Sequence, residues 1–283
     1  MKFLRLGPRG SESPALLATD GSYRDLTGVV RDVDGGIFAA DAMARLRSVD
    51  PMRLPLIDHK TRIGPCVGNV GKLIGVGLNY ADHAAEGNMP LPKEPILFMK
   101  ATSSIIGPDD DVVLPRGATQ PDWEVELGII IGREARYIDE ADALNHVGGY
   151  CVVNDVSERA FQHERGGQWT KGKSADTFGP IGPWVVTADE IPDPQKLRLW
   201  LEVDGHRYQN GTTSQMIFGV RKLVSYISQF MSLRPGDIIS TGTPAGVGAG
   251  QKPSPVWLRA GQVMRLSVEG LGEQSQRVRA FEP

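Results

Sequence analysis

Two glutamates separated by one residue are the first feature of this sequence that suggests chemistry. Glu124 and Glu126 lie in the apolar segment Trp123–Ile131, which has the composition of a β-strand. Successive side chains of a strand point to opposite faces, so the two carboxylates share one face, about 7 Å apart along the strand. Neighbouring carboxylates repel each other unless a cation binds them or one stays protonated. The pair predicts a cation site, with a solvated strand face as the alternative.

A third carboxylate follows a second apolar segment. Tyr150–Asn154 is typical of a buried strand, and Asp155 comes directly after it. With Glu124 and Glu126, Asp155 completes a set of oxygen ligands that contains no His or Cys. Such a set favours a hard cation, Mg²⁺ or Mn²⁺, over zinc. The alternative for Asp155 is a cap or turn residue before a helix predicted over 157–164.

A histidine and a glutamate three residues apart form a second candidate pair. His83 and Glu86 lie in the segment Asn79–Gly87, which we expect to form a short helix or an ordered lid. At this spacing the two side chains meet on one helical face. A carboxylate beside an imidazole orients the ring and raises its basicity, which suits the activation of a water molecule. The alternative is a surface ion pair, which is common at this spacing.

Polar side chains also surround a segment rich in glycine and lysine, residues 165–176. They are Arg159, Gln162, Lys173 and Thr177. A lysine in such a loop is usually solvated, but beside a metal and a bound carboxylate Lys173 becomes a fixed cation for an oxyanion.

The elements that must position these residues are mainly strands. Trp123, Val125 and Leu127 should form the core face of the strand that carries the glutamates. The predicted strands are Leu73–Leu78, Ile96–Met99, Trp123–Ile131, Tyr150–Asn154, Trp184–Thr187, Leu197–Val203, Ile238–Thr241 and Val263–Val268. Asp204-Gly205 predicts a hairpin turn. The fold class expected is therefore mixed β with a few helices.

Two helices and one boundary complete this organisation. Apolar residues at three- and four-residue steps predict a helix over Gln215–Met231, and Ile37–Leu46 predicts a shorter one. Turn chemistry and prolines divide the first 70 residues into short runs. We expect a small N-terminal β-rich domain over residues 1–70 and a catalytic domain over residues 71–283.

The composition excludes several classes of function. The chain has 283 residues with 31 Lys+Arg and 34 Asp+Glu, and a net charge of −3 gives no reason to expect nucleic acid as a partner. No apolar run approaches the roughly 20 residues of a membrane span, and the N-terminus lacks a signal-peptide core, so we expect no membrane partner and a cytoplasmic location. The cysteines, Cys66 and Cys151, form no CxxC pair, and we expect buried thiols. Nucleotide-binding, zinc-protease and nucleophilic-serine motifs are incomplete or missing.

Four segments together resemble the fumarylacetoacetate hydrolase family. They are Glu124-Val-Glu126, the NDVSER run with Asp155, GKSADTFGPIGPW from Gly172 to Trp184, and STGTPAGVG from Ser240 to Gly248. The resemblance extends from Leu73 to the C-terminus and implies a β-roll fold and a homodimer. It assigns the metal to Glu124, Glu126 and Asp155. It assigns substrate contacts to Arg159, Gln162, Lys173, Thr177 and Thr243, and a catalytic dyad to His83 and Glu86.

This resemblance implies hydrolysis of the C3–C4 bond of a 2,4-diketo acid to pyruvate and a short carboxylic acid. The stretch from His163 to Trp184 is most similar to members that act on 2,4-diketo-3-deoxy-L-rhamnonate or L-fuconate. His83, oriented by Glu86, would take a proton from water, while Lys173 and Gln162 stabilise the oxyanion at C4. The alternatives are an oxaloacetate decarboxylase or tautomerase, a ureidoglycolate-type lyase, and a non-catalytic binder of 2-keto acids.

Overall fold

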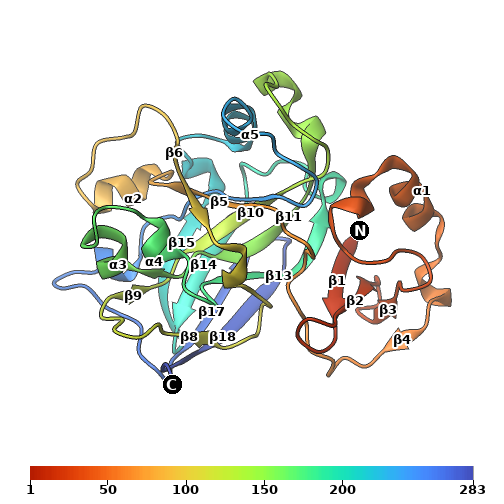
Figure 1. The fold of residues 1–283 in the computed structure, drawn as a ribbon, viewed down its shortest axis with the longest axis horizontal. Coiled ribbons are helices and arrows are strands. Elements are labelled where there is room, and N and C mark those ends of the chain that lie inside the picture. The colour runs from red at the N-terminus through yellow and green to blue at the C-terminus, as the bar shows by residue number, and fades with distance from the viewer. Residues whose placement is uncertain (283) are drawn as a thin grey trace.

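The structure, a computed structural model that describes residues 1–282, is built mainly of β-strands with short helices around them (Figure 1). The helices are α1 (Ala40–Ser48), α2 (Ala81–Glu86), α3 (Arg159–His163), α4 (Thr170–Lys173) and α5 (Val220–Ser228). The longer strands are β1 (Lys2–Leu6), β2 (Ser13–Leu17), β5 (Leu73–Gly77), β6 (Ile96–Lys100), β10 (Val125–Ile131), β11 (Val147–Asn154), β13 (Gly179–Thr187), β14 (Arg198–Val203), β15 (His206–Thr212), β17 (Val263–Val268) and β18 (Glu273–Arg279). The shorter strands are β3 (Tyr23–Asp25), β4 (Leu56–Ile57), β7 (Ile105–Ile106), β8 (Val112–Val113), β9 (Pro121–Asp122), β12 (Ser157–Glu158) and β16 (Ile238–Ser240).

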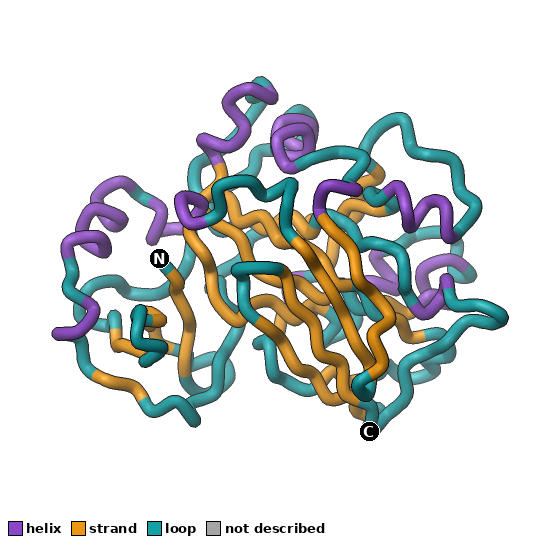
Figure 2. Tube along the Cα trace, turned by 180° about the vertical axis from the view of Figure 1, so that it is seen from behind, coloured by secondary structure: helices purple, strands orange, loops and turns teal. Residues whose placement is uncertain are grey.

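Most of the strands form two large mixed sheets, and β9 and β12 form a separate two-stranded sheet. The main sheet runs β4-β3-β2-β1-β13-β11-β10-β16-β5-β6, with β7 paired to β13, and the second runs β15-β14-β17-β18-β8. Most pairs are antiparallel, whereas β16 with β5, β13 with β7 and β18 with β8 are parallel. Seen from behind, the strands fill the centre of the molecule and the helices lie toward its rim (Figure 2). The predicted class, mixed β with a few helices, is confirmed.

The N-terminal residues form a lobe at one side that continues the main sheet. In Figure 1 this lobe, coloured red to orange, carries α1 and β1 to β4. Strand β1 pairs with β13, with Phe3 opposite Val185, so hydrogen bonds run unbroken from the lobe into the larger part. Phe3 and Leu16 also share one apolar cluster with Ile130 of β10 and Val153 of β11. The lobe therefore packs on the rest through both backbone and core, and its status as a domain of residues 1–70 stays a prediction.

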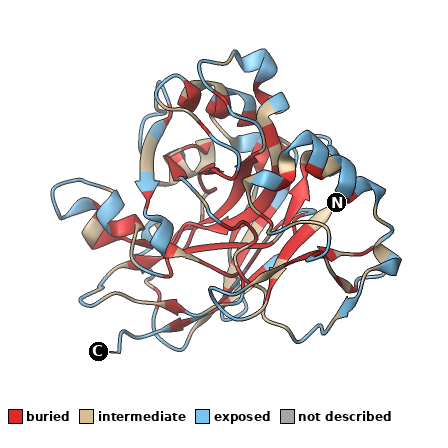
Figure 3. Cartoon of the chain, turned by 45° about the vertical axis from the view of Figure 1, so that its right-hand side comes forward, coloured by how far each residue is buried: buried red, intermediate tan, exposed pale blue. Residues whose placement is uncertain are grey.

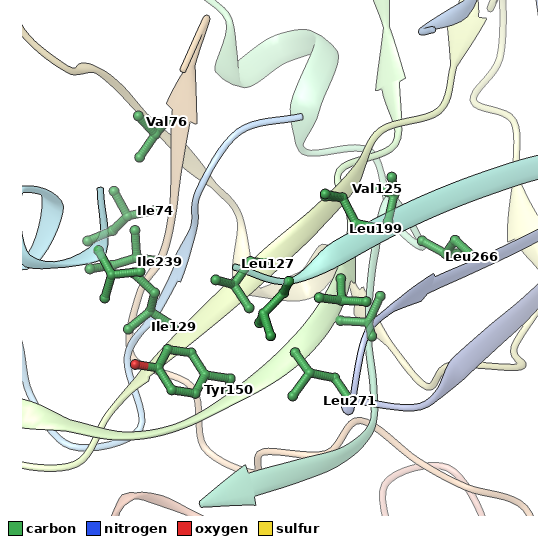
Figure 4. Close-up of a cluster of buried hydrophobic side chains, with 14 of the residues drawn as sticks. Ile74, Val76, Val125, Leu127, Ile129, Tyr150, Leu199, Ile239, Leu266 and Leu271 are labelled. Carbon is green, nitrogen blue, oxygen red and sulfur yellow. The ribbon is translucent and has the colours of Figure 1, made fainter. Parts of the chain in front are cut away.

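Strand β10 is buried at every position. Buried residues, red in Figure 3, fill the centre of the molecule. Val125 and Leu127, on the predicted core face, lie in one apolar cluster with Leu199 of β14 and Leu266 of β17 (Figure 4). Trp123 belongs to the same cluster, so the prediction for these three core residues is confirmed. The opposite face presents Glu126 at one end of the strand and packs Ile130 into the N-terminal cluster at the other end.

The predicted strands all appear, with bounds that differ by a few residues. The hairpin is confirmed too: β14 pairs with β15, and the left-handed φ values of Asp204 and Gly205, 50° and 81°, are those of a type I′ turn. Both cysteines are free and buried, as expected. Within residues 1–282 the structure contains no helix with the length and apolarity needed to cross a membrane.

Helix bounds were predicted less well than strands. The helix expected over Gln215–Met231 is shorter, because the backbone N–H of Val220 donates to Gln195 Oε1 and starts α5 there. Residues 165–176 are not simply a loop, since they contain α4. The helix expected over 157–164 begins only at Arg159, after Ser157 and Glu158 pair with β9.

Candidate metal and catalytic site

Three buried carboxylates meet where β10 and β11 run side by side. Each of Glu124, Glu126 and Asp155 offers one oxygen, and these oxygens lie within 4.8 Å of one another. The pairing of the strands causes this convergence. Val125 lies opposite Asn154, and the backbone N–H of Asp155 donates to the carbonyl of Glu124 at 2.9 Å. The sequence prediction that these three residues lie together is thus met by the geometry.

Positive side chains neutralise two of the three carboxylates. Lys173 Nζ donates to Glu124 Oε2 at 2.6 Å and to Asp155 Oδ2 at 2.7 Å, and Arg159 Nη2 donates to Glu124 Oε1 at 2.6 Å. Lys100 Nζ donates to Asp155 Oδ1 at 2.5 Å. Burial alone raises the pKa of Glu124, but Lys173 and Arg159 outweigh it and lower this pKa to about 2. Burial lowers the pKa of Lys100, although Asp155 opposes that shift.

Glu126 lacks such a cation. Its Oε2 accepts from Ser240 Oγ at 2.5 Å and from the backbone N–H of Gly242 at 2.9 Å. Burial, followed by the nearby charges of Asp155 and Glu124, raises the pKa of Glu126 well above its usual range. The Lys173 ammonium lies between Glu124 and Asp155, but no cationic side chain within residues 1–282 compensates Glu126. The three carboxylates can therefore accept a further positive charge. Oxygen donors alone fit a hard divalent cation such as Mg²⁺ or Mn²⁺.

The His83–Glu86 pair is formed and lies in α2. His83 Nδ1 lies 3.2 Å from Glu86 Oε2, and both side chains are half-buried. Glu86 Oε1 accepts from the backbone N–H of Gly246 at 3.0 Å, which ties α2 to the glycine-rich segment after β16. A Cβ on Gly250 would lie 2.3 Å from the Glu86 carboxyl carbon, so a larger residue there would displace this carboxylate from its present position. The carboxylate accepts from Nδ1–H, and Nε2 remains available as a base.

One cavity of about 370 Å³ joins the dyad to the carboxylates. His83, Glu86, Glu124 and Glu126 line this cavity, as do Lys173, Arg159, Gln162 and Thr243. Its volume lies in the range that binds small organic molecules. The predicted catalytic residues, most of the predicted substrate contacts and two of the three metal ligands thus border one space, and the third ligand, Asp155, lies directly behind Lys173.

Two predicted substrate contacts are engaged elsewhere. Thr177 is absent from the lining of this cavity, and its Oγ1 accepts from the backbone N–H of Val113 at 2.7 Å. Thr243 lines the cavity, but its hydroxyl donates to the carbonyl of Val125 at 2.9 Å and accepts from Gln209 Nε2 at 2.7 Å. The geometry therefore does not bring Thr177 to the cavity, and its role as a substrate contact stays a prediction.

Sequence reasoning missed several residues that shape the site. Lys100 ends an apolar strand and is wholly buried, and nothing in the local pattern distinguishes it from a solvated lysine. Asp122 Oδ2 accepts from Arg159 Nε at 2.9 Å, and its Oδ1 accepts from the backbone N–H of Gly248 at 2.6 Å. Phe98 and Trp169 form an aromatic wall of the cavity. Only the convergence of distant strands and loops identifies these contacts.

Comparisons with known proteins agree with this arrangement. Residues 72–279 match the family described as fumarylacetoacetate (FAA) hydrolase C-terminal. A protein of Burkholderia lata, named as a hydrolase with no substrate given, is 62% identical over 279 residues, which is 99% of each chain.

Solved structures share the fold. A fumarylacetoacetate hydrolase from Exiguobacterium antarcticum has a TM-score of 0.88 and 36% identity, covering 99% of this chain and 100% of that chain. A maleylpyruvate hydrolase from Sphingobium, in complex with manganese(II) and pyruvate, has a TM-score of 0.80 and 27% identity over 100% of both chains. A protein of Mycobacterium abscessus named as a 2-hydroxyhepta-2,4-diene-1,7-dioate isomerase has a TM-score of 0.84 and 29% identity over 100% of both chains.

Proposed function

The chain belongs to the fumarylacetoacetate hydrolase family, and on that premise we propose that it is a divalent-metal-dependent hydrolase of 2,4-diketo acids. In this reaction water adds across the C3–C4 bond and releases pyruvate and a carboxylic acid. The observation that carries the proposal is the shared cavity, which the His83–Glu86 dyad and the carboxylate cluster both border. The manganese(II) and pyruvate bound to the Sphingobium relative support the same cofactor and product class.

The residues of the chain supply the proton transfers and the charges. A divalent metal held by Glu124, Glu126 and Asp155 would supply Lewis acidity toward the 2-keto acid end of the substrate. His83 Nε2 takes a proton from water, and Glu86 stabilises the imidazolium that forms. The hydroxide adds to C4, the C3–C4 bond breaks, and His83 returns the proton to C3.

In the proposed reaction, Lys173 and Gln162 hold the negative charge that develops on the C4 oxygen. Both are buried, and both line the cavity. A buried ammonium acts in a low-dielectric site, where it stabilises an oxyanion more strongly than it would in water. Arg159 donates to Gln162 Oε1 at 3.1 Å and so fixes the orientation of that amide.

The dyad favours hydrolysis over its rivals. Neither an isomerase nor an oxaloacetate decarboxylase needs an activated water at C4, although each uses a metal and a 2-keto acid. A ureidoglycolate-type lyase needs no C–C cleavage. A binding protein without activity has no need for the orientation of His83 by Glu86. These alternatives predict different products, so product analysis separates them.

The test is a product assay with acetylpyruvate, the simplest acylpyruvate, in the presence of Mg²⁺ or of EDTA. We expect pyruvate and acetate in equal amounts, with turnover abolished by EDTA. Carbon dioxide from oxaloacetate, without cleavage of acetylpyruvate, would replace hydrolysis with decarboxylation.

Three finer points remain proposals. The similarity of the 163–184 stretch to sugar-acid members supports a 2,4-diketo-3-deoxy sugar acid as one candidate substrate. Its assay measures lactate and pyruvate from 2,4-diketo-3-deoxy-L-rhamnonate. Light scattering of the purified protein tests the homodimer, and fractionation of the source cells tests the cytoplasmic location.

A further inference from the structure

The cavity lining has a charged part and an apolar part. Lys173 and Arg159 contact Glu124 in the charged part. Strand β6 leads away from it, because Lys100 contacts Asp155, Phe98 lies near Lys173, and Ile96 is partly exposed. The remaining lining is largely apolar. It includes Met89, Ile96, Phe98, Trp169, Val247 and Trp257. A 2,4-diketo acid held by its keto-acid end at the charged end points its acyl substituent toward the apolar end.

Strand β6 supplies one apolar wall through its pleat. Side chains two residues apart in a strand share a face, so Ile96 and Phe98 face the cavity together. Leu97 packs against the main core instead, and Met99 is absent from the cavity lining. The Phe98 ring also lies 5.0 Å from Lys173 Nζ, which places it at the border between the charged and apolar ends.

Trp169 extends the same aromatic wall. Its ring centroid lies 5.5 Å from that of Phe98 and 5.9 Å from that of His163. The indole rests directly on the backbone of β5, since a Cβ on Gly77 would lie 2.2 Å from Trp169 Cζ3. Glycine at this position therefore makes room for a flat aromatic surface beside the site.

The apolar end offers no cation to a second carboxylate. Among residues 1–282, the lysine and arginine side chains that line the cavity are Lys173 and Arg159, and both contact Glu124, a proposed metal ligand at the charged end. Burial, helped by the charges of Arg159 and Lys173, lowers the pKa of His163 and so disfavours a charged imidazole there. Gln120 directs its amide to Glu164 at 3.1 Å. An unpaired carboxylate placed here loses hydration without a compensating partner.

We propose that this site selects 2,4-diketo acids whose acyl group is uncharged and apolar, an aryl or alkyl chain, over dicarboxylic and polyhydroxylated ones. The inference rests on the proposed function and assigns its substrate class, and it ranks the 2,4-diketo-3-deoxy sugar acid named above below apolar acylpyruvates. An aryl group can pack against the surface that the Phe98 and Trp169 rings form together, where aromatic rings pair favourably. A lactoyl or carboxyalkyl group buries less apolar surface and leaves polar atoms without partners.

The first test compares kcat/KM over a panel of acylpyruvates with Mg²⁺. The panel contains acetylpyruvate, benzoylpyruvate, hexanoylpyruvate, 2,4-dioxoheptanedioate and 2,4-diketo-3-deoxy-L-rhamnonate. We expect benzoyl- or hexanoylpyruvate to exceed the last two by at least about tenfold. A preference for the dicarboxylic or the hydroxylated substrate overturns the inference but leaves the proposed hydrolysis intact. Cleavage of none of them overturns the proposed function.

The second test measures binding without turnover. 2-Keto-4-phenylbutanoate and 2-ketoadipate lack the C4 carbonyl, so calorimetry with Mg²⁺ compares their affinities on intact ligands. We expect the phenyl compound to bind at least about tenfold more tightly. Equal affinities, or tighter binding of 2-ketoadipate, would show that the apolar end does not select and would overturn the inference even if no acylpyruvate is cleaved.

A positive charge introduced at one residue of the apolar end should shift the ratio of the two affinities toward 2-ketoadipate. Ile96 is 38% exposed and lines the cavity, so Ile96→Arg can place a cation there without entering the core. Met99→Arg is the matched control, because Met99 lies on the same strand, is 37% exposed and is absent from the cavity lining. We expect Ile96→Arg to shift the affinity ratio toward 2-ketoadipate by about tenfold or more, and Met99→Arg to leave it unchanged. Equal effects of the two substitutions would contradict the proposed orientation of the substrate.

Discussion

Glu126→Gln separates the metal-binding role of Glu126 from its place in the fold. Both hydrogen bonds that Glu126 accepts, from Ser240 and from Gly242, reach the same oxygen, Oε2. A glutamine can put its carbonyl oxygen in that position and keep both bonds. Its NH₂ group then takes the place of Oε1, so the residue can no longer offer a negative charge to the cluster with Glu124 and Asp155. The variant should fold normally and lose the metal.

The expected magnitudes follow from linkage. The raised pKa means that native Glu126 keeps its proton above 4.5, the ordinary value, whereas the unfolded chain has lost it. Without metal, wild-type stability should therefore fall as pH rises from 4.5 to the native pKa, by up to about 1.4 kcal/mol per pH unit from this group. Glu126→Gln removes that slope. Metal at about 100 times its Kd should stabilise the wild type by about 2.7 kcal/mol, or roughly 5–10 °C in Tm, and the variant hardly at all.

The assay is thermal unfolding of both proteins between pH 5 and pH 8, with EDTA and with excess Mg²⁺ or Mn²⁺. Glu202→Gln is the matched control, because Glu202 lies on β14, pairs with Arg207 and Arg265, and is absent from the cavity lining. The control should keep the metal-induced shift in Tm. An undiminished shift in Glu126→Gln would refute the assignment of Glu126 as a ligand. A variant less stable than wild type in EDTA at pH 8 would refute the argument that its charge is uncompensated.

Three further outcomes test the rest of the site. His83→Ala should lower kcat by roughly 10²–10⁴-fold while the metal-induced shift in Tm remains, and an unchanged kcat would rule out the dyad as the water activator. Lys173→Met should lower kcat more than it changes KM, since the ammonium stabilises the developing oxyanion; a change in KM alone would make Lys173 a binding residue. Removal of residues 1–70 should give an insoluble or unfolded protein, because it exposes β13 and the cluster around Ile130, and a soluble, active truncated chain would show that the lobe is dispensable.

Local pattern predicted the strands well, because short apolar runs bounded by turn residues are typical of buried strands. The alternation through β10 placed Val125 and Leu127 in the core and the two glutamates on the other face. The hairpin at Asp204 and Gly205 was equally clear, since few residue pairs tolerate two left-handed φ values in succession. Helix ends were predicted poorly, because a distant side chain, that of Gln195, determines where α5 begins.

The sequence by itself determined which chemical groups are present: three acidic residues without His or Cys partners, and a His–Glu pair at helical spacing. The family resemblance assigned a role to each of them. Only the tertiary structure decided which of their charges are balanced. Lys100 contacts Asp155 and Asp122 contacts Arg159, so both belong to the site, whereas Thr177 does not line the cavity. The physical reason is that charge compensation and cavity lining depend on distances between segments far apart in the chain. Those distances follow from sheet pairing and core packing, which the spacing of residues along the sequence does not encode.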